Sequence, residues 1–476
     1  MHSVPAKKSR RALAVIVLAA GLGTRMKSKI PKVLHTICGR PMIEWINRTA
    51  AAVSPDRLLV VLGPGLDDAH QFLPQNAQVI IQEEQLGTGD AVRSCQDALA
   101  GFDGDIVIMY GDTPLVTGEE LGELLAVHTR SNPACTVMTV EMEDPGHYGR
   151  VCRDADGRVT RIVEHRDATE EEMRICEVNA GVYAFESASL WEALAEVGSD
   201  NVQGEVYLTD VIGILSNRSL VVLVHRVEDA NVTLGVNSRL DLARVEAIMR
   251  RRIIDRHMIE GVTVRDPDST YVDADVKIGS DTVLEPLTRL VGKTVVGEDC
   301  LIGPSTTLID SAVDDGATVV FSHAAGAEIG AGCSVGPFAS LRPGARLAPG
   351  AKAGTFVEIK NSLIGAKAKV PHLSYVGDAE VGEGTNIGAG NITANYDGVR
   401  KHRTVIGRRV NTGAATTFVA PVTVGNDSMT GAGSVINNDV PEGALGIARS
   451  RQRNIADYAR KKFRPRQDRE TGRSEE

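Results

Sequence analysis

The carboxy-terminal part of the chain places an apolar residue at every sixth position, and this period restricts the fold more than any other feature of the sequence. The repeated positions begin with Val272, Ile278, Leu284, Leu290, Val296, Ile302 and Leu308, resume at Ile329, and end at Ile436. An α-helix repeats every 3.6 residues and a simple strand every two. A period of six is the signature of hexapeptide repeats, whose short strands stack coil on coil. We therefore predict a left-handed parallel β-helix over residues 262–448.

Two segments interrupt the six-residue period. One is 314–328, and the other is 391–404, which reads NITANYDGVRKHRT. A loop that leaves a repetitive coil costs its core nothing, and such loops often carry functional residues. We expect both segments to form loops of this kind.

The first part of the chain alternates apolar strands with helical patterns. We expect strands at 14–20, 57–62, 79–82, 106–110 and 135–140, and helices at 42–52, 89–99 and 119–129. Such alternation predicts an α/β fold, a Rossmann-like domain with a mostly parallel sheet covered on both faces, over residues 12–237. Ligands of such sheets bind at the carboxyl ends of the strands.

Two segments lie outside the α/β domain and the β-helix. Residues 238–261 have a helical period, with Leu242, Val245, Met249 and Ile253 along one face, and we interpret them as a linker helix. Residues 449–476 are rich in Arg and Lys and have no periodicity. They are interpreted as a mobile basic tail.

The start of the chain has two interpretations. Residues 7–11, KKSRR, precede the apolar run ALAVIVLAAG, which resembles a secretory signal but also fits a basic tail followed by the first strand. We favour the strand, because a functional motif begins inside the apolar run and a signal would be cleaved away. No apolar run reaches the ~18 residues that span a bilayer, so we expect no membrane partner.

Charge and cysteine content exclude further classes. The net charge of -10 argues against a nucleic-acid partner. The 7 cysteines are scattered, without a CxxC pair, so a disulfide framework or zinc knuckle is not expected. Together these features fit a protein of the reducing cytoplasm.

A glycine-rich loop follows the first predicted strand. Residues 18–26 read LAAGLGTRM, and small residues of this kind let backbone N–H groups close on phosphate oxygens. Arg25 and Lys32 add full positive charges, which suits a triphosphate. The loop is not a P-loop, since GxxxxGK[ST] is absent. The alternative is a plain glycine turn into a helix.

Asp112 stands at the end of the buried strand IVIMYGD, where a carboxylate is either a helix N-cap or a metal ligand. Mg²⁺ favours one or two protein carboxylates together with phosphates and waters, which fits a lone Asp opposite a phosphate loop. Gln82, Gly87 and Thr88, in QEEQLGTGDA, are well placed to contact a base edge.

These motifs, with YGDTPL, YGRV, IVEHRDAT, GEVYLTD and GVNSRLDL, resemble those of the sugar-1-phosphate nucleotidyltransferases. Combined with the hexapeptide coil, they closely resemble the bacterial family of bifunctional N-acetylglucosamine-1-phosphate uridylyltransferases/glucosamine-1-phosphate N-acetyltransferases. The resemblance covers roughly residues 12–455.

For the first domain, the resemblance implies attack of a sugar phosphate on the α-phosphorus of UTP, with release of pyrophosphate. Arg25 and Lys32 would offset phosphate charge, Asp112 and Asn237 would hold Mg²⁺, and Gly149, Glu164 and Asn179 would hold the N-acetylglucosamine moiety. The residues implied to bind nucleotide and sugar are Leu18, Ala19, Ala20, Gly21, Lys32, Gln82, Gly87, Thr88, Tyr110, Gly111, Asp112, Gly149, Glu164, Asn179 and Asn237.

For the coil, the resemblance implies transfer of an acetyl group from acetyl-CoA to glucosamine 1-phosphate. His372 would be the general base, since the ammonium form of the amine is inert. The alternative interpretation of His372 is a residue at a corner of the coil that faces solvent. The implied sugar-phosphate ligands are Arg342, Lys360, Tyr375 and Asn386, and those of acetyl-CoA are Ala389, Asn395, Tyr396, Ala414, Ala432 and Arg449. Ala414 stands where many relatives carry a serine.

The spacing of the coil residues bears on oligomeric state. Arg342 and Lys360 are 18 residues apart, and His372 follows 12 residues later. If one coil holds three hexapeptides, Arg342 and Lys360 stack on one face and His372 lies two faces further on. A homotrimer would bring different faces together across an interface.

The sequence leaves two other functions open. One is a single-function nucleotidyltransferase whose coil is structural or regulatory, and the other is a scaffold with two inactive sites. HLSYVGDAE and NYDG argue against the first, because a purely structural coil has no use for them. Intact Arg25, Lys32, Asp112 and His372 argue against the second. The favoured product, UDP-N-acetylglucosamine, would supply peptidoglycan and lipopolysaccharide-type polymers.

Overall fold

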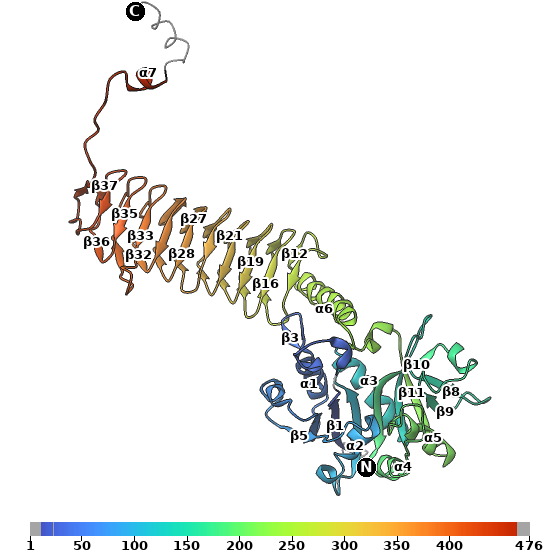
Figure 1. The fold of residues 1–476 in the computed structure, drawn as a ribbon. Helices are drawn as coiled ribbons and strands as arrows, with labels where there is room; N and C mark the ends of the chain where they lie inside the picture. The colour runs from blue at the N-terminus through green and yellow to red at the C-terminus, as the bar shows by residue number, and fades with distance from the viewer. Residues whose placement is uncertain (1–10, 22, 464–476) are drawn as a thin grey trace, which may run out of the picture. The chain divides into compact units, whose positions relative to one another are not determined.

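A computed structural model describes residues 11–21 and 23–463, which form two compact units (Figure 1). The first unit runs to Glu260 and includes Tyr271–Val276, and the second comprises Gly261–Thr270 and the chain from Lys277. The basic residues 7–10 and the last part of the predicted tail, 464–476, lie outside the described residues.

The first unit is built on one sheet with the strand order β11-β7-β10-β6-β1-β4-β5. Neighbours in this order are parallel except around β10, which runs antiparallel to β6 and β7. The strands are β1 (Ala12–Ala19), β4 (Arg57–Leu62), β5 (Ala77–Ile81), β6 (Gly104–Tyr110), β7 (Cys135–Glu141), β10 (Glu177–Glu186) and β11 (Val222–Val227). The predicted mostly parallel sheet is therefore confirmed.

Two short hairpins accompany this sheet. β8 (Arg150–Arg153) and β9 (Val159–Val163) pair with each other, and β8 also pairs with β10. β2 (Thr36–Ile37) and β3 (Arg40–Pro41) form a separate two-stranded ribbon.

Helices cover both faces of the sheet, and their bounds are α1 (Met42–Ala52), α2 (Thr88–Arg93), α3 (Gly118–Ser131), α4 (Ser187–Leu194), α5 (Asp210–Asn217) and α6 (Arg239–Ile259). The short 3₁₀ turns in the described part of the chain are η1 (Thr24–Met26), η2 (Lys32–Leu34), η3 (Asp67–Phe72), η4 (Asp97–Leu99), η5 (Glu172–Arg174) and η6 (Ala230–Thr233). The helix expected at 89–99 is shorter than predicted, since α2 ends at Arg93 and the chain continues through turns into η4.

The core of the first unit lies on both sides of the sheet. Successive side chains of a strand point to opposite faces, so Ala14 and Ile16 belong to one cluster of buried side chains, and Val15 and Val17 to the other. Because both faces are covered, the strands are apolar almost throughout.

The linker helix α6 begins with a capping box in which the Ser238 hydroxyl and the Asp241 carboxylate each bond the other's backbone N–H. Val245, Met249 and Ile253 are buried along its predicted apolar face. Among the described residues, no helix is both long and apolar enough to cross a bilayer.

The second unit is a coil of short strands in three parallel sheets, which we call faces one, two and three (Figure 1). Face one contains β12 (Thr263–Val264), β15 (Val283–Leu284), β18 (Leu301–Ile302), β21 (Thr318–Val319), β24 (Ser334–Val335), β27 (Lys352–Thr355) and β30 (Lys369–His372). Near the end of the coil, β37 (Met429–Thr430) pairs with β39 (Leu445–Gly446).

The chain visits the other two faces in turn after face one. Face two contains β16 (Arg289–Val291), β19 (Thr307–Ile309), β22 (His323–Ala325), β25 (Ser340–Leu341), β28 (Glu358–Lys360), β31 (Tyr375–Gly377), β33 (Ile392–Ala394), β35 (Thr417–Val419) and β38 (Val435–Ile436). Face three contains β14 (Lys277–Ile278), β17 (Val295–Val296), β20 (Ala312–Val313), β23 (Glu328–Ile329), β26 (Arg346–Leu347), β29 (Leu363–Ile364), β32 (Ala379–Val381), β34 (Thr404–Ile406) and β36 (Val422–Val424).

The six-residue period corresponds to the interior of this coil. The repeated residues, from Leu284 and Leu290 to Phe418 and Ile436, are buried. Small polar residues two positions earlier are buried as well and bond the backbone, as where the Thr282 hydroxyl donates to the Gly297 carbonyl at 2.8 Å. The predicted hexapeptide β-helix is therefore confirmed.

The first interruption of the period does not leave the coil, so the expected loop at 314–328 is wrong. β21 and β22 lie within this segment, and Val319 and Ala324 are buried on the coil axis. The coil is merely shorter here: Val283 pairs with Leu301 one coil later, whereas Ala312 already pairs with Glu328. The turns at the corners are shorter in this coil, so the strands stay stacked.

The second interruption does leave the coil. Ile392–Ala394 remains on face two as β33, and residues 395–403 form a loop before β34. In the tail, which was expected to lack structure, Tyr458–Lys462 form the short helix α7.

Candidate functional site

A cavity of about 430 Å³ opens at the carboxyl edge of the first sheet, where β1, β5 and β6 end. It is lined by Leu18, Ala19, Ala20, Gly21, Lys32, Val33, Gln82, Gln85, Gly87, Thr88, Ala91, Tyr110, Gly111, Asp112 and Glu205. The strand ends therefore gather the glycine-rich loop, QEEQLGTG and YGD around one space, as expected for such a sheet.

Close backbone approaches hold the glycine-rich loop in place beside this cavity. Gly23 has φ +61, and a Cβ built on it would lie 2.5 Å from the Lys32 Cβ. Gly111 donates its N–H to the Leu18 carbonyl at 2.8 Å, and a Cβ there would meet Ala19 at 2.9 Å. Larger residues at these two positions would push the glycine-rich loop away from Lys32 and Tyr110.

Lys32 stands at the centre of a polar cluster. Its ammonium lies 2.6 Å from Asp112 Oδ2 and 3.3 Å from Asn237 Oδ1, although these partners are 80 and 205 residues away in the sequence. Arg25 donates to the same Asn237 oxygen at 3.0 Å. Two oxygen ligands thus converge on one cationic atom, and a second cation stands beside them.

A second cavity of about 870 Å³ shares Gly21, Lys32 and Glu205 with the first, so the two are continuous. Its remaining lining residues are Gly23, Thr24, Arg25, His147, Glu164, His165, Arg166, Gln203 and Asn237. The Lys32 cluster therefore lies where the two cavities join.

Gly149, Glu164 and Asn179 come together beside the second cavity. The Asn179 N–H donates to the Gly149 carbonyl at 3.0 Å, and a Cβ on Gly149 would lie 3.6 Å from both Glu164 carboxylate oxygens. The side-chain amide of Asn179 donates to the Tyr183 hydroxyl at 2.6 Å and accepts from the Gly181 N–H at 3.0 Å. Asn179 is thus locked in one orientation.

Burial raises the pKa of Glu164 above its ordinary value, and the neighbouring carboxylates of Asp210, Asp167 and Glu205 raise it further. The hydroxyl of Thr209 opposes this by donating to Glu164 Oε1 at 3.0 Å. Burial also raises the pKa of Tyr110, so its hydroxyl remains a neutral hydrogen-bonding group.

In the first cavity, Gln82 is buried and its amide nitrogen is already engaged. It donates to the Gly87 carbonyl at 3.2 Å and to Asp90 Oδ2 at 2.8 Å. These bonds leave the Gln82 carbonyl oxygen as an acceptor for a ligand.

On the coil, the register confirms the predicted stacking of Arg342 and Lys360. Ser340 pairs with Glu358 and Leu341 with Ile359, so Arg342 stands level with Lys360 at the far end of face two. Arg342 Nη1 lies 2.8 Å from Glu358 Oε1. Tyr375 begins the next strand of the same face.

His372 ends β30 on face one, two faces beyond Lys360, as predicted. It is exposed, and its carbonyl accepts the Gly390 N–H at 3.1 Å. Asn386 continues the same face by a bridge to Lys369. One copy of the coil therefore holds His372 and Arg342 on different faces.

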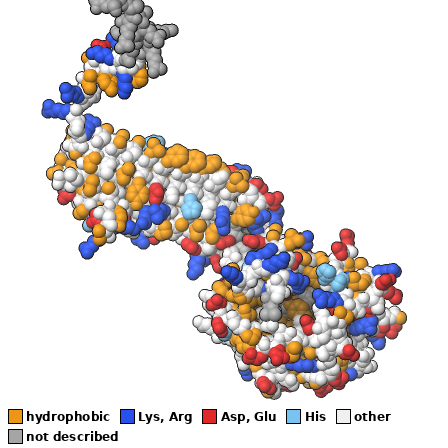
Figure 2. All heavy atoms as spheres, in the orientation of Figure 1, with side chains coloured by type: hydrophobic (Ala, Val, Ile, Leu, Met, Phe, Trp, Pro, Cys, Tyr) orange, Lys and Arg blue, Asp and Glu red, His pale blue; other side chains and the backbone are white. Residues whose placement is uncertain are grey.

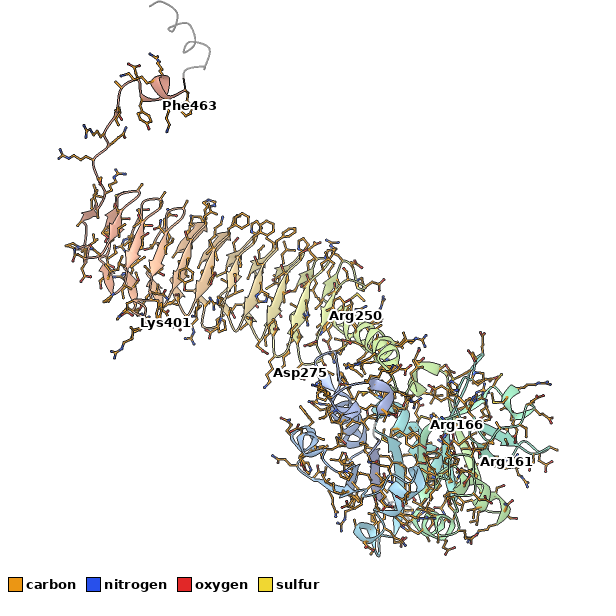
Figure 3. All side chains as sticks on the ribbon, viewed as in Figure 1. Arg161, Arg166, Arg250, Asp275, Lys401 and Phe463 are labelled. Atoms are coloured by element: carbon orange, nitrogen blue, oxygen red, sulfur yellow. The ribbon has the colours of Figure 1, made fainter. Side chains whose placement is uncertain are left out.

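The loop 395–403 is held against the coil by its own polar contacts. The amide of Asn395 donates to Asp378, and His402 Nε2 lies 2.6 Å from Asp397 Oδ2. Lys401 projects from this loop (Figure 3) and is the largest cause of the lowered pKa of Lys360. The Lys401 ammonium therefore lies near that of Lys360.

The residues expected at the acetyl-CoA site lie on neighbouring coils. The Ala389 carbonyl accepts the Ala415 N–H at 2.7 Å, and the Ala414 carbonyl accepts the Gly433 N–H at 2.8 Å. Arg449 donates to the Ala432 carbonyl at 2.7 Å. Tyr396 stands apart on the loop, with its hydroxyl bonded to the Gly398 carbonyl at 2.6 Å.

Comparison with known proteins gives consistent results. Residues 15–203 match the family described as a MobA-like NTP transferase domain. The chain is 49% identical to the bifunctional protein GlmU of Mycobacterium marinum over 94% of this chain and 93% of that protein. For the proteins of the same name from Corynebacterium efficiens and Rubrobacter xylanophilus, identity is 47% and 51%, over 94% and 91% of this chain and 94% and 92% of theirs. The chain belongs to the GlmU family.

In this GlmU family member, the structure brings together the residues predicted from the sequence for the nucleotide and sugar. All of these residues except Gly149 and Asn179 line one of the two joined cavities. Gly149 lies beside Glu164, which lines the second cavity, and Asn179 bonds to Gly149. On the coil, His372 is not brought to Arg342 and Lys360 within one copy.

The sequence analysis did not identify some residues of these sites. Gln85 donates to the Ala20 carbonyl at 3.2 Å, and Glu205 lines both cavities. Both lie inside motifs that were quoted for the family, so motif membership was the available signal. Lys401 lies in the period-breaking loop, but only its approach to Lys360 distinguishes it from the neighbouring Arg400 and Arg403.

The residues at the first site fit a magnesium ion. Asp112 and Asn237 offer oxygen ligands, which Mg²⁺ prefers, and the position between them already attracts the ammonium of Lys32. No group of three or more His, Cys, Asp or Glu side chains suited to a metal occurs in the described part of the chain. Such an ion would therefore depend on substrate phosphates and waters for its remaining ligands.

Proposed function

We propose that the protein makes UDP-N-acetylglucosamine in two steps: it acetylates glucosamine 1-phosphate with acetyl-CoA, and it then transfers UMP from UTP to N-acetylglucosamine 1-phosphate with release of pyrophosphate. The observation that carries the second step is the Lys32 cluster at the junction of two cavities. The proposed nucleotide cavity and sugar cavity meet at the cations that phosphoryl chemistry needs.

In uridylyl transfer, the protein's task is to position two phosphates and to stabilise charge, because no covalent bond to the enzyme is required. Arg25 and Lys32 supply positive charge at the α-phosphate. Asp112 and Asn237 would hold Mg²⁺, which supplies further charge stabilisation when bound.

The sugar would be held next to this centre. Gly149 leaves room for the N-acetylglucosamine ring, and Glu164 accepts hydrogen bonds from its hydroxyls. The fixed Asn179 amide keeps the wall of this pocket in place. Gln82, Gly87 and Thr88 would receive the uracil base.

For acetyl transfer, Arg342, Lys360 and Tyr375 on face two would bind the phosphate and sugar of glucosamine 1-phosphate, with Asn386 from face one. His372 would take the proton from the attacking amine as the C–N bond forms and the C–S bond of acetyl-CoA breaks. Ala389, Asn395, Tyr396, Ala414, Ala432 and Arg449 would line the acetyl-CoA site.

We further propose a homotrimer. The support is the division of the acetyl-transfer residues between faces, since His372 and Lys360 face different directions in one coil. Neighbouring copies would complete each site.

The deciding experiment supplies purified protein with glucosamine 1-phosphate, acetyl-CoA, UTP and Mg²⁺, and follows CoA and pyrophosphate separately. We expect release of both products. Pyrophosphate release from supplied N-acetylglucosamine 1-phosphate without any CoA release would instead support the single-function nucleotidyltransferase.

A further inference from the structure

Two turns that are far apart in the sequence line the second cavity. Residues 164–167 form one of them, which we call the Glu164 turn, and residues 199–205 form the other, which we call the Asn201 turn. Figure 2 shows a hollow on the first unit with Lys, Arg and His side chains gathered beside it. The lining residues that the two turns supply are Glu164, His165, Arg166, Gln203 and Glu205.

Each turn is closed by its own hydrogen bonds. In the Glu164 turn, the Asp167 N–H donates to the Glu164 carbonyl at 3.0 Å. In the Asn201 turn, the side-chain oxygen of Asn201 accepts the N–H groups of Gln203 at 3.1 Å and Glu205 at 3.2 Å. Such side-chain bonds to the following backbone fix the shape of a turn. Each turn therefore presents its lining residues as one unit.

One hydrogen bond joins the two turns. Asp167 Oδ1 accepts the Val202 N–H at 3.0 Å, across 35 residues of sequence. The Val202 side chain is 72% exposed, so its burial does not hold the Asn201 turn in place. The far end of this turn is fixed separately, since the Val206 N–H donates to the Leu86 carbonyl at 2.7 Å. The bond to Asp167 therefore sets the position of the near end.

Asp167 is costly for stability at this position. Its Oδ2 is buried and has no hydrogen-bond partner among the described residues. Burial, and then the neighbouring charge of Asp167, raise the pKa of Asp210, so these two carboxylates repel each other. A carboxylate that loses water without a full set of partners, beside a like charge, destabilises the fold. Costs of this kind are expected where a residue serves function.

We propose that Asp167 is a positioning residue for the sugar phosphate: its hydrogen bond to Val202 holds the two turns at the separation that N-acetylglucosamine 1-phosphate requires. The proposal rests on the proposed uridylyl transfer. Asp167 is not among the residues that line either cavity, so it acts through the turns and not by touching the substrate. Without the bond, binding of the sugar phosphate must also order the Asn201 turn, and this ordering lowers affinity.

Amide hydrogen exchange tests the bond directly. Asp167→Ala in the full chain removes the acceptor, so exchange in peptides that cover residues 199–205 should become roughly 10-fold faster at Val202. Asp167→Asn keeps an acceptor oxygen, and its exchange should stay within about threefold of the original. Unchanged exchange in Asp167→Ala would show that the bond does not hold the Asn201 turn, and would overturn the proposal.

Steady-state kinetics test the positioning role. Asp167→Ala should raise KM for N-acetylglucosamine 1-phosphate roughly 10-fold, while kcat and KM for UTP stay within about threefold. Asp167→Asn should restore most of the lost affinity. An equally large rise of KM in Asp167→Asn would assign the effect to the lost charge and contradict a role for the hydrogen bond. A fall of kcat with unchanged KM would contradict the proposal as well.

Changes at the donor provide a second route that does not depend on the folding of Asp167→Ala. Val202→Pro removes the N–H and should raise the same KM, since proline has no backbone donor. Val202→Ala keeps the N–H and loses only an exposed side chain, so its KM should equal that of the original chain. A Val202→Pro protein that is folded and has an unchanged KM would overturn the proposal.

Asp154 offers a matched control in the same unit. Its Oδ1 accepts the N–H groups of Asp156 at 3.0 Å and Arg158 at 2.8 Å, in the turn between β8 and β9, and it lines neither cavity. Asp154→Ala should leave KM for the sugar phosphate and exchange at residues 199–205 unchanged. The same changes in this control would indicate general loosening and contradict a specific role of Asp167.

The failure of this proposal can be distinguished from the failure of the proposed function. If the original chain releases no pyrophosphate, the proposed uridylyl transfer fails, whereas exchange at Val202 still tests the bond. If the enzyme is active and exchange responds as expected but KM for the sugar phosphate does not move in Asp167→Ala, the bond exists and Asp167 is not a positioning residue.

Discussion

Asp112 and Lys32 illustrate how single residues define the first site. The ammonium of Lys32 lies 2.6 Å from the Asp112 carboxylate, in a position that a divalent cation could share or take over. Lys32 and Asp112 side chains are only 11% and 21% exposed, so their attraction is stronger than that of a surface ion pair. Substrate phosphates that enter this cluster would meet two cations and the carboxylate that we propose to hold Mg²⁺.

Asp112→Ala should lower uridylyl transfer by roughly 100-fold or more, because it removes the carboxylate that would hold the Mg²⁺ that offsets phosphate charge. Pyrophosphate release from supplied N-acetylglucosamine 1-phosphate measures this effect. CoA release from the same preparation is the control and should stay near that of the original chain. A collapse of both activities in a folded variant would show that the two sites are not separate.

Glu164→Gln should stabilise the protein at neutral pH while weakening sugar binding. The pKa of Glu164 is raised by burial, so the folded state binds its proton more tightly than the unfolded state. The ionised carboxylate therefore costs stability at pH above the folded pKa, and this cost disappears as the pH falls below the ordinary value. The melting temperature of the variant should exceed that of the original chain at pH 7.5, and the difference should vanish near pH 4.

The exposed Glu143 offers a matched control, since Glu143→Gln should change the melting temperature little at either pH. In the uridylyl assay, Glu164→Gln should raise KM for the sugar phosphate more than it lowers kcat. An unchanged melting temperature at both pH values would contradict the cost assigned to the buried charge.

His372→Ala should lower acetyl transfer by roughly 10²–10⁴-fold, the usual contribution of a general base. The coil should keep its fold, because His372 is exposed and not part of the interior. Uridylyl transfer from supplied N-acetylglucosamine 1-phosphate should be unchanged. Near-original acetyl transfer by the variant would remove His372 from the mechanism.

At the scale of elements, α1 contains a polar residue where its packing calls for an apolar one. Asn47 lies on the buried face with Ile43, Ile46 and Ala50, and its side-chain amide has no hydrogen-bond partner among the described residues. A buried amide of this kind costs stability, since it loses water without a replacement bond. A cavity of about 340 Å³ beside it, lined by Ala51, Phe72 and Leu73 among others, leaves room for a larger side chain.

Asn47→Leu should raise the free energy of unfolding by about 1–3 kcal/mol, the usual penalty of an unpaired buried polar group. Chemical denaturation that follows the unfolding of the first unit measures this free energy. Asn217→Leu on α5 is the matched control, because Asn217 is exposed and should change stability by less than about 0.5 kcal/mol. Loss of stability in Asn47→Leu would show that this face of α1 needs the amide.

At the scale of the whole molecule, the boundary between the two units differs from the one predicted from the sequence. α6 and Tyr271–Val276 belong to the first unit, where the Ala274 N–H donates to the Cys38 carbonyl at 3.0 Å and Val245 and Met249 are buried. The linker helix is therefore part of the packing of the α/β unit, whereas the sequence suggests a separate connecting segment.

Separated units should keep their own activities. A fragment of residues 1–276 should retain uridylyl transfer and melt at a higher temperature than one of residues 1–237, because the shorter fragment loses the buried side of α6. A fragment from about residue 262 should retain acetyl transfer as a trimer by light scattering. A monomer with full acetyl transfer would contradict a site shared between copies.

The sequence by itself determined the features that repeat locally. Each hexapeptide carries its own buried residue, and strands such as Arg57–Leu62 are apolar because both faces of the sheet are covered, so the β-helix and the mostly parallel sheet could be predicted. The family motifs also placed most lining residues of the first site, because those residues follow strand ends.

Only the tertiary structure decided which distant groups meet. Lys32, Asp112 and Asn237 come from remote segments, and their contact depends on how β1 and β6 pack side by side. The segment 314–328 stays in the coil because corners absorb missing residues while burial of Val319 and Ala324 is kept. Phe321, Phe338 and Phe356 contact one another, with ring centroids 5.8 Å and 5.3 Å apart, because the stacking of successive coils brings these distant residues together.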